Sequence, residues 1–150
     1  MAPNSETVLR KVVAAVRGRK PTNILIRGGR KRQQESLARS LATAIGSDLS
    51  RVGLKGVVSK YIGETEKNIN QVFKRAAQTN TLLFFDEADA LFGKRSEVRD
   101  AHDRYANLQT NYLLTQMEAH QGISILTTNK RHKPPKAFLR RFRYVIELPF

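Results

Sequence analysis

Apolar residues follow two different spacings along this chain of 150 residues. Short continuous apolar runs are typical of strands buried on both faces of a parallel sheet, whereas apolar positions three and four apart indicate amphipathic helices. The clearest helical pattern covers Glu64–Gln78, with acidic residues in its first turn that suit the positive end of the helix dipole. Its apolar face is formed by Ile69, Val72, Phe73, Ala76 and Ala77.

The same reading predicts five strands separated by helices. The expected strands are Asn23–Arg27, Asp48–Val52, Thr81–Phe85, Ile123–Thr127 and Tyr144–Leu148. The expected helices cover residues 5–18, 33–45, 64–78 and about 102–119, and the second has Leu37, Leu41, Ala44 and Ile45 on one face. Strands that alternate with helices predict an α/β fold with a largely parallel sheet.

Composition narrows the class of protein. Apolar residues make up 40% and charged residues 27% of the chain, as in ordinary globular proteins. The length suits a single domain. There is no cysteine, which excludes disulfides and thiolate metal sites, and no apolar run is long enough to span a membrane. We expect a cytoplasmic protein.

Positive charge is concentrated towards the two ends of the chain. The net charge is +14, from 27 basic and 13 acidic residues. Residues 1–35 carry nine basic and two acidic residues, and residues 130–150 carry seven and one. Such a field attracts polyanions, so nucleic acid or an acidic protein is a possible partner, and a solvated basic surface is an equal alternative.

A pair of carboxylates, Asp86 and Glu87, directly follows the buried strand of TLLFFDEADALF. Ligands of open parallel sheets bind at the carboxyl ends of strands. In a nucleotide hydrolase, one such carboxylate holds Mg²⁺ through water and the other orients the attacking water. The alternative is an acidic start of the next helix, where Asp and Glu are favoured.

Several further motifs occur in register with this pair. They are VVSKYIGETEKNINQVFKRA before it, DEADALFGKRSEVRDAHDRYAN around it, SILTTN after it and AFLRRFRYVIELP near the end. With these motifs the chain resembles the AAA family of ATPases from about Asn23 to Pro149, and is most similar to FtsH/spastin-like members that accompany bacterial contractile injection systems. The resemblance implies a P-loop NTPase-like three-layer αβα sandwich with a five-stranded parallel sheet of order 5-1-4-3-2.

The resemblance also implies roles for individual residues around a bound nucleotide. Asp86 and Glu87 are similar to the Walker B pair, with Asp86 holding Mg²⁺ through water and Glu87 activating water. Asn129 resembles the sensor of the γ-phosphate, although Asn is also a common turn residue. Arg140 and Arg141 lie in the region of the arginine fingers that reach a neighbouring subunit, and Arg143 is a third candidate.

A resemblance to a substrate-gripping loop is carried by four residues, Lys60, Tyr61, Ile62 and Gly63. In the family this pore loop contacts a threaded polypeptide. A core contact is the alternative for Tyr61. The polar and turn-forming neighbours of the segment favour the pore loop.

The phosphate-binding loop departs from the family pattern G-x-x-G-x-G-K-[ST]. Counted without a gap, Gly28 and Gly29 open the loop, Lys31 stands at a later glycine position, Gln34 stands for the lysine and Glu35 for the hydroxyl. A carboxylate near a triphosphate is repulsive by on the order of a few kcal/mol in a partly dry site. Losing the later glycines disfavours the positive φ angles of the cradle. We expect weak or absent ATP binding.

We expect a basic N-terminal helix (1–22) followed by an AAA αβ core (23–150), which either is a fragment of a longer protein or lacks the family's helical lid. Three functional hypotheses follow for this chain. The first is a degenerate AAA subunit that associates with AAA subunits as a homo- or hetero-oligomer, with a protein substrate possible. The second is an active ATPase that uses ATP and Mg²⁺ through an unconventional loop in which Lys31 or Arg32 contacts phosphate. The third is a polyanion-binding module that uses the basic ends.

Overall fold

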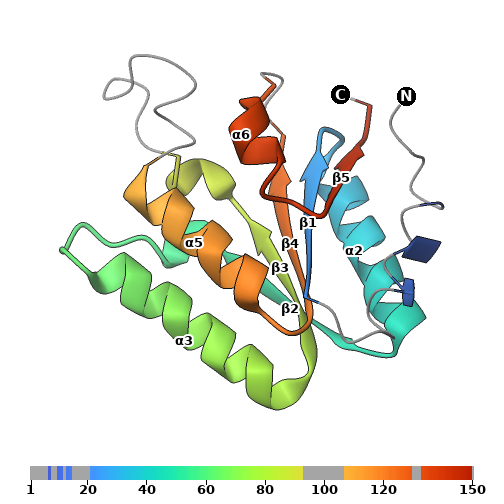
Figure 1. Cartoon of the computed structure of the whole chain (residues 1–150), viewed down its shortest axis with the longest axis horizontal. Helices are drawn as coiled ribbons and strands as arrows, with labels where there is room; N and C mark the ends of the chain where they lie inside the picture. The colour runs from blue at the N-terminus through green and yellow to red at the C-terminus, as the bar shows by residue number, and fades with distance from the viewer. Residues whose placement is uncertain are drawn as a thin grey trace.

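Five parallel strands form a single sheet in the order β2-β3-β4-β1-β5 (Figure 1). The fold is that of a computed structural model, which describes residues 21–92, 107–129 and 133–149 and single positions at 7, 10, 11, 13 and 14. The strands are β1 (Thr22–Arg27), β2 (Asp48–Gly53), β3 (Thr81–Asp86), β4 (Ile123–Thr128) and β5 (Tyr144–Glu147). This is the predicted order of 5-1-4-3-2 read from the other edge, so the expected fold is confirmed.

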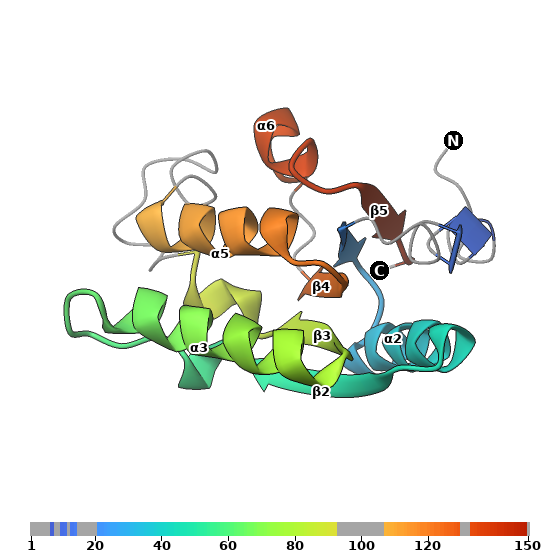
Figure 2. The same cartoon turned by 60° about the horizontal axis from the view of Figure 1, so that its bottom comes forward.

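Helices cover both faces of the sheet (Figure 2). The long helices are α2 (Lys31–Ile45), α3 (Glu64–Thr79) and α5 (Leu108–Ala119), and α6 (Lys136–Leu139) is a single turn. Alternate residues of β1 point to opposite faces: Leu25 belongs to the apolar cluster under α3 and α5, whereas Ile24 and Ile26 belong to the cluster under α2. The chain therefore folds into three layers, as predicted.

Local sequence explains where α3 begins and ends. Gly63, with φ of 83°, precedes its first turn, which carries Glu64 and Glu66, and Asn80 ends the helix in a left-handed conformation. Thr65, Ile69, Phe73 and Ala76 are buried, while Val72 is half-buried and Ala77 is exposed. The predicted apolar face of this helix was thus too wide, because it included the exposed Ala77.

The other helices differ more from the expected bounds. α2 begins at Lys31 rather than Gln33, and its buried residues are Gln34, Ala38, Leu41 and Ala42. The predicted Ala44 is exposed, because the buried face is rotated towards the two alanines that fit closest to the sheet. α6 was not predicted. α5 is described from Leu108, so the expected residues 102–106 lie outside the described part of the chain.

The N-terminal segment is described only in part. Residues 7, 10, 11, 13 and 14 are helical, as expected, and the rest of residues 1–20 lies outside the described residues. The proposed boundary after residue 22 stays a prediction. Among the described helices, none combines the length and apolar character that a membrane crossing requires.

The parallel sheet brings three strand ends to one edge. β1, β3 and β4 end at Arg27, Asp86 and Thr128; β1 is paired with β4 up to Arg27 and Thr128, and β3 with β2 up to Asp86, whereas the pairing of β3 with β4 stops at Phe85 and Leu126. Gly28 extends the pairing because its N–H donates to Thr128 O at 3.0 Å. This edge is where the candidate site lies.

Candidate functional site

A cleft of about 490 Å³ opens at the carboxyl edge of β3 and β4 and beside the start of α2. It collects most of the residues that the sequence singled out around a nucleotide, since Lys31, Gln34, Asp86, Glu87 and Asn129 all line it. The remaining lining residues are Lys55, Ala88, Asp89, Ala90, Thr127 and Thr128. The structure therefore brings together side chains from three separate motifs.

The connection between β1 and α2 is very short. Only Gly28, Gly29 and Arg30 lie between the last strand residue and Lys31, the first residue of α2. Both glycines have positive φ, 80° and 74°. The eight-residue pattern expected from Gly28 to Glu35 thus contains a turn of only three residues, and its second half is helical.

Two of the three N–H groups in this turn already have acceptors within the protein. Gly28 N–H donates to Thr128 O at 3.0 Å, and Arg30 N–H donates to the side-chain oxygen of Gln33 at 2.7 Å. The phosphate-binding loops of nucleotide hydrolases use such N–H groups to hold phosphate oxygens. In this chain those donors face protein acceptors instead.

Gln34 is a buried structural residue in this arrangement. Its side chain is 4% exposed, and its amide nitrogen donates to Gly28 O at 2.8 Å and to Thr128 O at 3.3 Å. It joins α2 to the ends of β1 and β4. The lysine that the family pattern places here would bring a charged ammonium into the same space.

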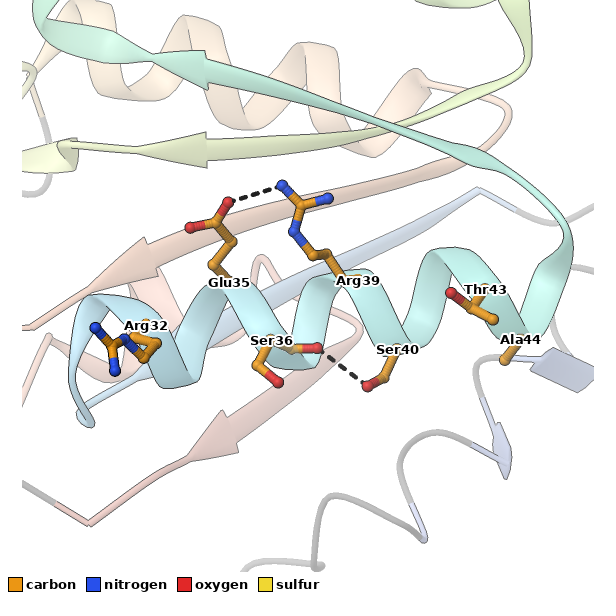
Figure 3. A pocket seen from close by; sticks show the side chains of 7 residues that line it. All are labelled: Arg32, Glu35, Ser36, Arg39, Ser40, Thr43 and Ala44. Carbon is orange, nitrogen blue, oxygen red and sulfur yellow. Dashed lines mark hydrogen bonds and ion pairs between the residues drawn. The ribbon is translucent and has the colours of Figure 1, made fainter.

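Glu35 lies apart from the cleft. It lines a shallow groove along α2 and pairs with Arg39 one turn later at 3.0 Å (Figure 3). The same groove is bordered by Arg32, Ser36 and Ser40, so the structure places Arg32 beside Glu35 rather than among the cleft residues. The two positions expected to hold the metal-binding hydroxyl and a substitute phosphate contact are therefore not cleft-lining residues.

Asp86 is held by cations from two neighbouring elements. It is 3% exposed, and its Oδ2 lies 2.7 Å from Nη2 and 2.9 Å from Nε of Arg51 on β2. Lys31 Nζ lies 3.7 Å from the same oxygen. Oδ1 is buried and has no hydrogen-bond partner among the described residues. The hydrogen bond and charge of Asp86, and more weakly the charges of Glu35 and Glu87, raise the pKa of Arg51.

Arg51 was missed by the sequence analysis. It is the single arginine of β2, and only the pairing of β2 with β3 shows that it lies near Asp86. Gly53 lies directly opposite Asp86 in that pairing, and Arg51 precedes it by two residues on the same face of β2. A prediction of the register between β2 and β3 would have placed Arg51 close to Asp86.

Glu87 has a strained backbone and a defined position beside β2. Its φ of 60° is left-handed, which is uncommon for a residue with a side chain. A Cβ on Gly53 would lie 2.5 Å from Glu87 Oε1, so the carboxylate lies directly over this glycine. Asn129 follows β4 and is exposed at the opposite side of the cleft.

The residues around Asp86 do not fit a magnesium ion well. Mg²⁺ requires oxygen ligands in near-octahedral geometry. The accessible Asp86 oxygen contacts a guanidinium and an ammonium, and the Thr127 hydroxyl donates to Phe85 O at 3.3 Å. In the part of the chain that the structure describes, no three His, Asp or Glu side chains gather as a metal site.

The three candidate arginine fingers have different surroundings. Arg141 is bound to α5, since its guanidinium contacts Glu118 at 2.5 Å, Asn111 at 2.8 Å and Thr115 at 3.3 Å. Arg143 stacks near the ring of Tyr144. Arg140 is exposed at the end of α6, and its side chain makes no hydrogen bond or ion pair with the described residues.

The expected pore-loop residues form an exposed turn before α3. Tyr61 is 63% exposed and Ile62 is fully exposed, so neither is a core contact. The turn is held from below: Ser59 donates its hydroxyl to Glu64 at 2.6 Å, and Ser59 N–H donates to Thr65. Lys60 Nζ lies 5.5 Å from the Tyr61 ring centre.

The fold and the cleft define a P-loop NTPase-like α/β domain. The sequence model of the "ATPase family associated with various cellular activities (AAA)" matches residues 36–150, which is most of the chain. The chain belongs to the AAA family. Members of this family in general use nucleotide and Mg²⁺. The matched segment begins directly after Glu35.

Relatives of known name agree with this assignment. The chain is 30% identical over 136 residues to the 26S proteasome subunit RPT4 of Saccharomyces cerevisiae, covering 86% of this chain and 31% of that protein. It is 31% identical over 140 residues to cell division protein C of Sulfolobus acidocaldarius, covering 86% and 37%. The 26S proteasome regulatory subunit 10B homolog A of Arabidopsis thaliana is 29% identical over 136 residues, covering 86% and 34%. The chain thus spans about a third of the length of these relatives.

Proposed function

We propose that this chain is a non-catalytic AAA domain that binds Mg²⁺–ATP weakly or not at all and acts beside other AAA subunits. The observation that carries the proposal is the closed turn between β1 and α2. Gly28 N–H and Arg30 N–H are bonded within the protein, and the buried Gln34 amide joins this turn to β4.

Opening this turn for a triphosphate is costly. Each hydrogen bond contributes about 0.5–1.5 kcal/mol, and a buried carbonyl left without a donor costs about 1–3 kcal/mol. A ligand would have to supply this free energy before its phosphates gained the N–H groups of Gly28 and Arg30. Asp86 adds to the cost, because its cleft-facing oxygen is paired with Arg51.

Other parts of the chain retain features that suit an assembly. Glu87 and Asn129 line the cleft, Arg140 is exposed and free to reach outwards, and Tyr61 is exposed at a turn. The yeast relative is named as a subunit of the 26S proteasome, which supports a role among several AAA subunits. We propose that Arg140 serves a neighbour's nucleotide and that Lys60–Gly63 contacts a polypeptide substrate.

Nucleotide calorimetry tests the loss of binding. The full chain is titrated with ATP in Mg²⁺, and the titration is repeated on a variant in which residues 28–35 are replaced by an intact eight-residue G-x-x-G-x-G-K-T loop. We expect no measurable binding by the wild-type chain and micromolar binding by the repaired chain. Micromolar, Mg²⁺-dependent binding by the wild-type chain would overturn the proposal.

One observation supports a second candidate, an active ATPase with an unconventional loop. Lys31 is the first residue of α2 and its Nζ lies 3.7 Å from Asp86, so an ammonium is available at the mouth of the cleft. Steady-state phosphate release separates the two candidates. Release that is abolished by Glu87→Gln and by Lys31→Ala would favour the active enzyme over the non-catalytic domain.

A further inference from the structure

The guanidinium of Arg51 is paired with the carboxylate of Asp86, at the end of β3. Its Nε and Nη2 both approach Asp86 Oδ2, at 2.9 and 2.7 Å. The side chain reaches forward along β2 from a position two residues before Gly53, which lies opposite Asp86. The space over Gly53 is taken by the Glu87 carboxylate, whose Oε1 would lie 2.5 Å from a Cβ at that position, so the acidic side chains of Asp86 and Glu87 both lie beside β2.

The negative charges around the Arg51 guanidinium hold it beside Asp86. Asp86 is its direct partner, and Glu35 and Glu87 are near enough to add attraction. Arginine keeps its charge at all ordinary pH values, so this partly exposed cation cannot be lost by titration. Two hydrogen bonds to one carboxylate oxygen also fix its direction.

A divalent ion at Asp86 would compete for the same oxygen. Oδ1 is buried, and Oδ2 faces both Arg51 and the Lys31 ammonium at 3.7 Å. A metal ion must therefore displace the guanidinium or bind within a few ångströms of two positive charges. Either route disfavours Mg²⁺, which also gives up its water ligands reluctantly.

We propose that the Arg51 guanidinium permanently replaces the divalent cation at Asp86, which makes Arg51 the residue that excludes metal ions from this cleft. Any phosphate group that enters the cleft then meets the ammonium of Lys31, which lines the cleft, in place of a metal ion. The inference rests on the proposed function only in that the cleft is taken not to use Mg²⁺–ATP.

Paramagnetic broadening by Mn²⁺ tests the proposal without nucleotide. The ¹⁵N-labelled full chain and its Arg51→Ser variant are titrated with MnCl₂, and the amide signals of Gly53, Asp86 and Glu87 are followed. In the wild-type chain we expect no preferential broadening of these signals. In the variant we expect preferential broadening, with an apparent Mn²⁺ affinity at least ~10-fold higher, because one positive charge near the carboxylate is gone.

Two control variants make the comparison specific. Arg75→Ser removes an equal charge from an exposed position of α3 and should leave the Mn²⁺ response as in the wild-type chain. Adding Asp86→Asn to Arg51→Ser should abolish the gained binding. If Arg51→Ser does not fold, the wild-type titration decides alone, since preferential broadening around Asp86 would overturn the proposal.

The outcomes separate this proposal from the proposed function. A wild-type chain that binds Mn²⁺ at Asp86 as tightly as the Arg51→Ser variant, yet binds no ATP, would overturn the role of Arg51 alone. A wild-type chain that binds ATP with micromolar affinity in EDTA, and takes up no Mn²⁺, would overturn the loss of nucleotide binding and leave the role of Arg51 intact.

Discussion

Gln34 joins three segments of the chain through one buried amide. Its Nε2 donates to the carbonyl oxygens of Gly28 and Thr128, which lie at the ends of β1 and β4. A backbone carbonyl buried without a donor is unfavourable, so the side chain at position 34 helps to decide the conformation of the turn before α2. The sequence pattern alone gave this residue the role of a missing lysine, whereas the structure gives it hydrogen bonds of its own.

Replacing Gln34 by alanine should therefore destabilise the fold. We expect Gln34→Ala to lower the free energy of unfolding by about 1–3 kcal/mol, since both carbonyls lose their side-chain donor. Urea denaturation measures the change. Gln78→Ala, at an exposed position of α3, is the matched control and should change stability by less than about 0.5 kcal/mol. Equal effects of the two variants would contradict the role given to Gln34.

Gly29 is required by both its backbone angle and its neighbour. Its φ is 74°, and a Cβ would lie 2.9 Å from Leu148 Cδ1. Gly46 has a similar φ of 68° but open space around it, so Gly46→Ala isolates the backbone cost of about 1–2 kcal/mol. We expect Gly29→Ala to cost about 1–3 kcal/mol more, from crowding against Leu148. Thermal or urea unfolding of both variants measures the loss of stability. Equal losses in the two variants would show that the Leu148 side chain moves aside at no cost.

At the scale of elements, predictability follows from how local each signal is. The helix over Glu64–Thr79 was predicted well because its caps and apolar spacing lie within its own sequence. The start of α2 was not, because the family pattern favoured a loop where the chain forms helix from Lys31 onward. The contact of Arg51 with Asp86 depends on which strands pair, and that information lies between segments 35 residues apart.

The packing of α5 against α3 predicts a pH dependence. His120 follows α5, its ring lies edge-on to Phe73 at 5.4 Å, and its Nε2 is buried without a partner among the described residues. Burial lowers the pKa of His120 below its ordinary value of 6.5. Below about pH 6.5 the unfolded chain therefore binds a proton that the folded chain resists, and stability falls as pH decreases.

His120→Gln should weaken this dependence. The variant lacks the titrating ring, so it should lose less stability than the wild-type chain between about pH 8 and about pH 5. The carboxylates titrate in both proteins, and the difference between the two curves isolates His120. Urea unfolding at a series of pH values measures it. Parallel curves would show that the ring is protonated equally in the folded and unfolded chains.

For the whole molecule, polar side chains that are paired within the chain differ from those that remain available to another subunit. Arg51 and Lys31 are partly exposed but paired with Asp86, and Gln34 is buried, whereas Arg140 is exposed on α6 and has no side-chain partner among the described residues. Arg141 is committed to α5 through Glu118, Asn111 and Thr115. Of Arg140 and Arg141, we therefore propose Arg140 as the residue that reaches a second subunit.

Mixing experiments test whether Arg140 or Arg141 acts on the nucleotide site of a neighbouring subunit. The chain with residues 28–35 replaced by an intact loop and with Arg51→Ser supplies a nucleotide site that can take Mg²⁺, and an excess of wild-type chain supplies the neighbours. We expect ATP hydrolysis per repaired chain to persist in this mixture and to fall at least ~10-fold when the excess chain carries Arg140→Ala, because an arginine finger typically contributes a factor of about 10³ or more. Arg141→Ala should instead lower the unfolding free energy of its own chain by about 1 kcal/mol, through its partly exposed contacts with α5, and leave the rate in the mixture nearly unchanged. Loss of hydrolysis with Arg141→Ala and none with Arg140→Ala would show that the contacts to α5 open in the assembly and that Arg141 is the finger.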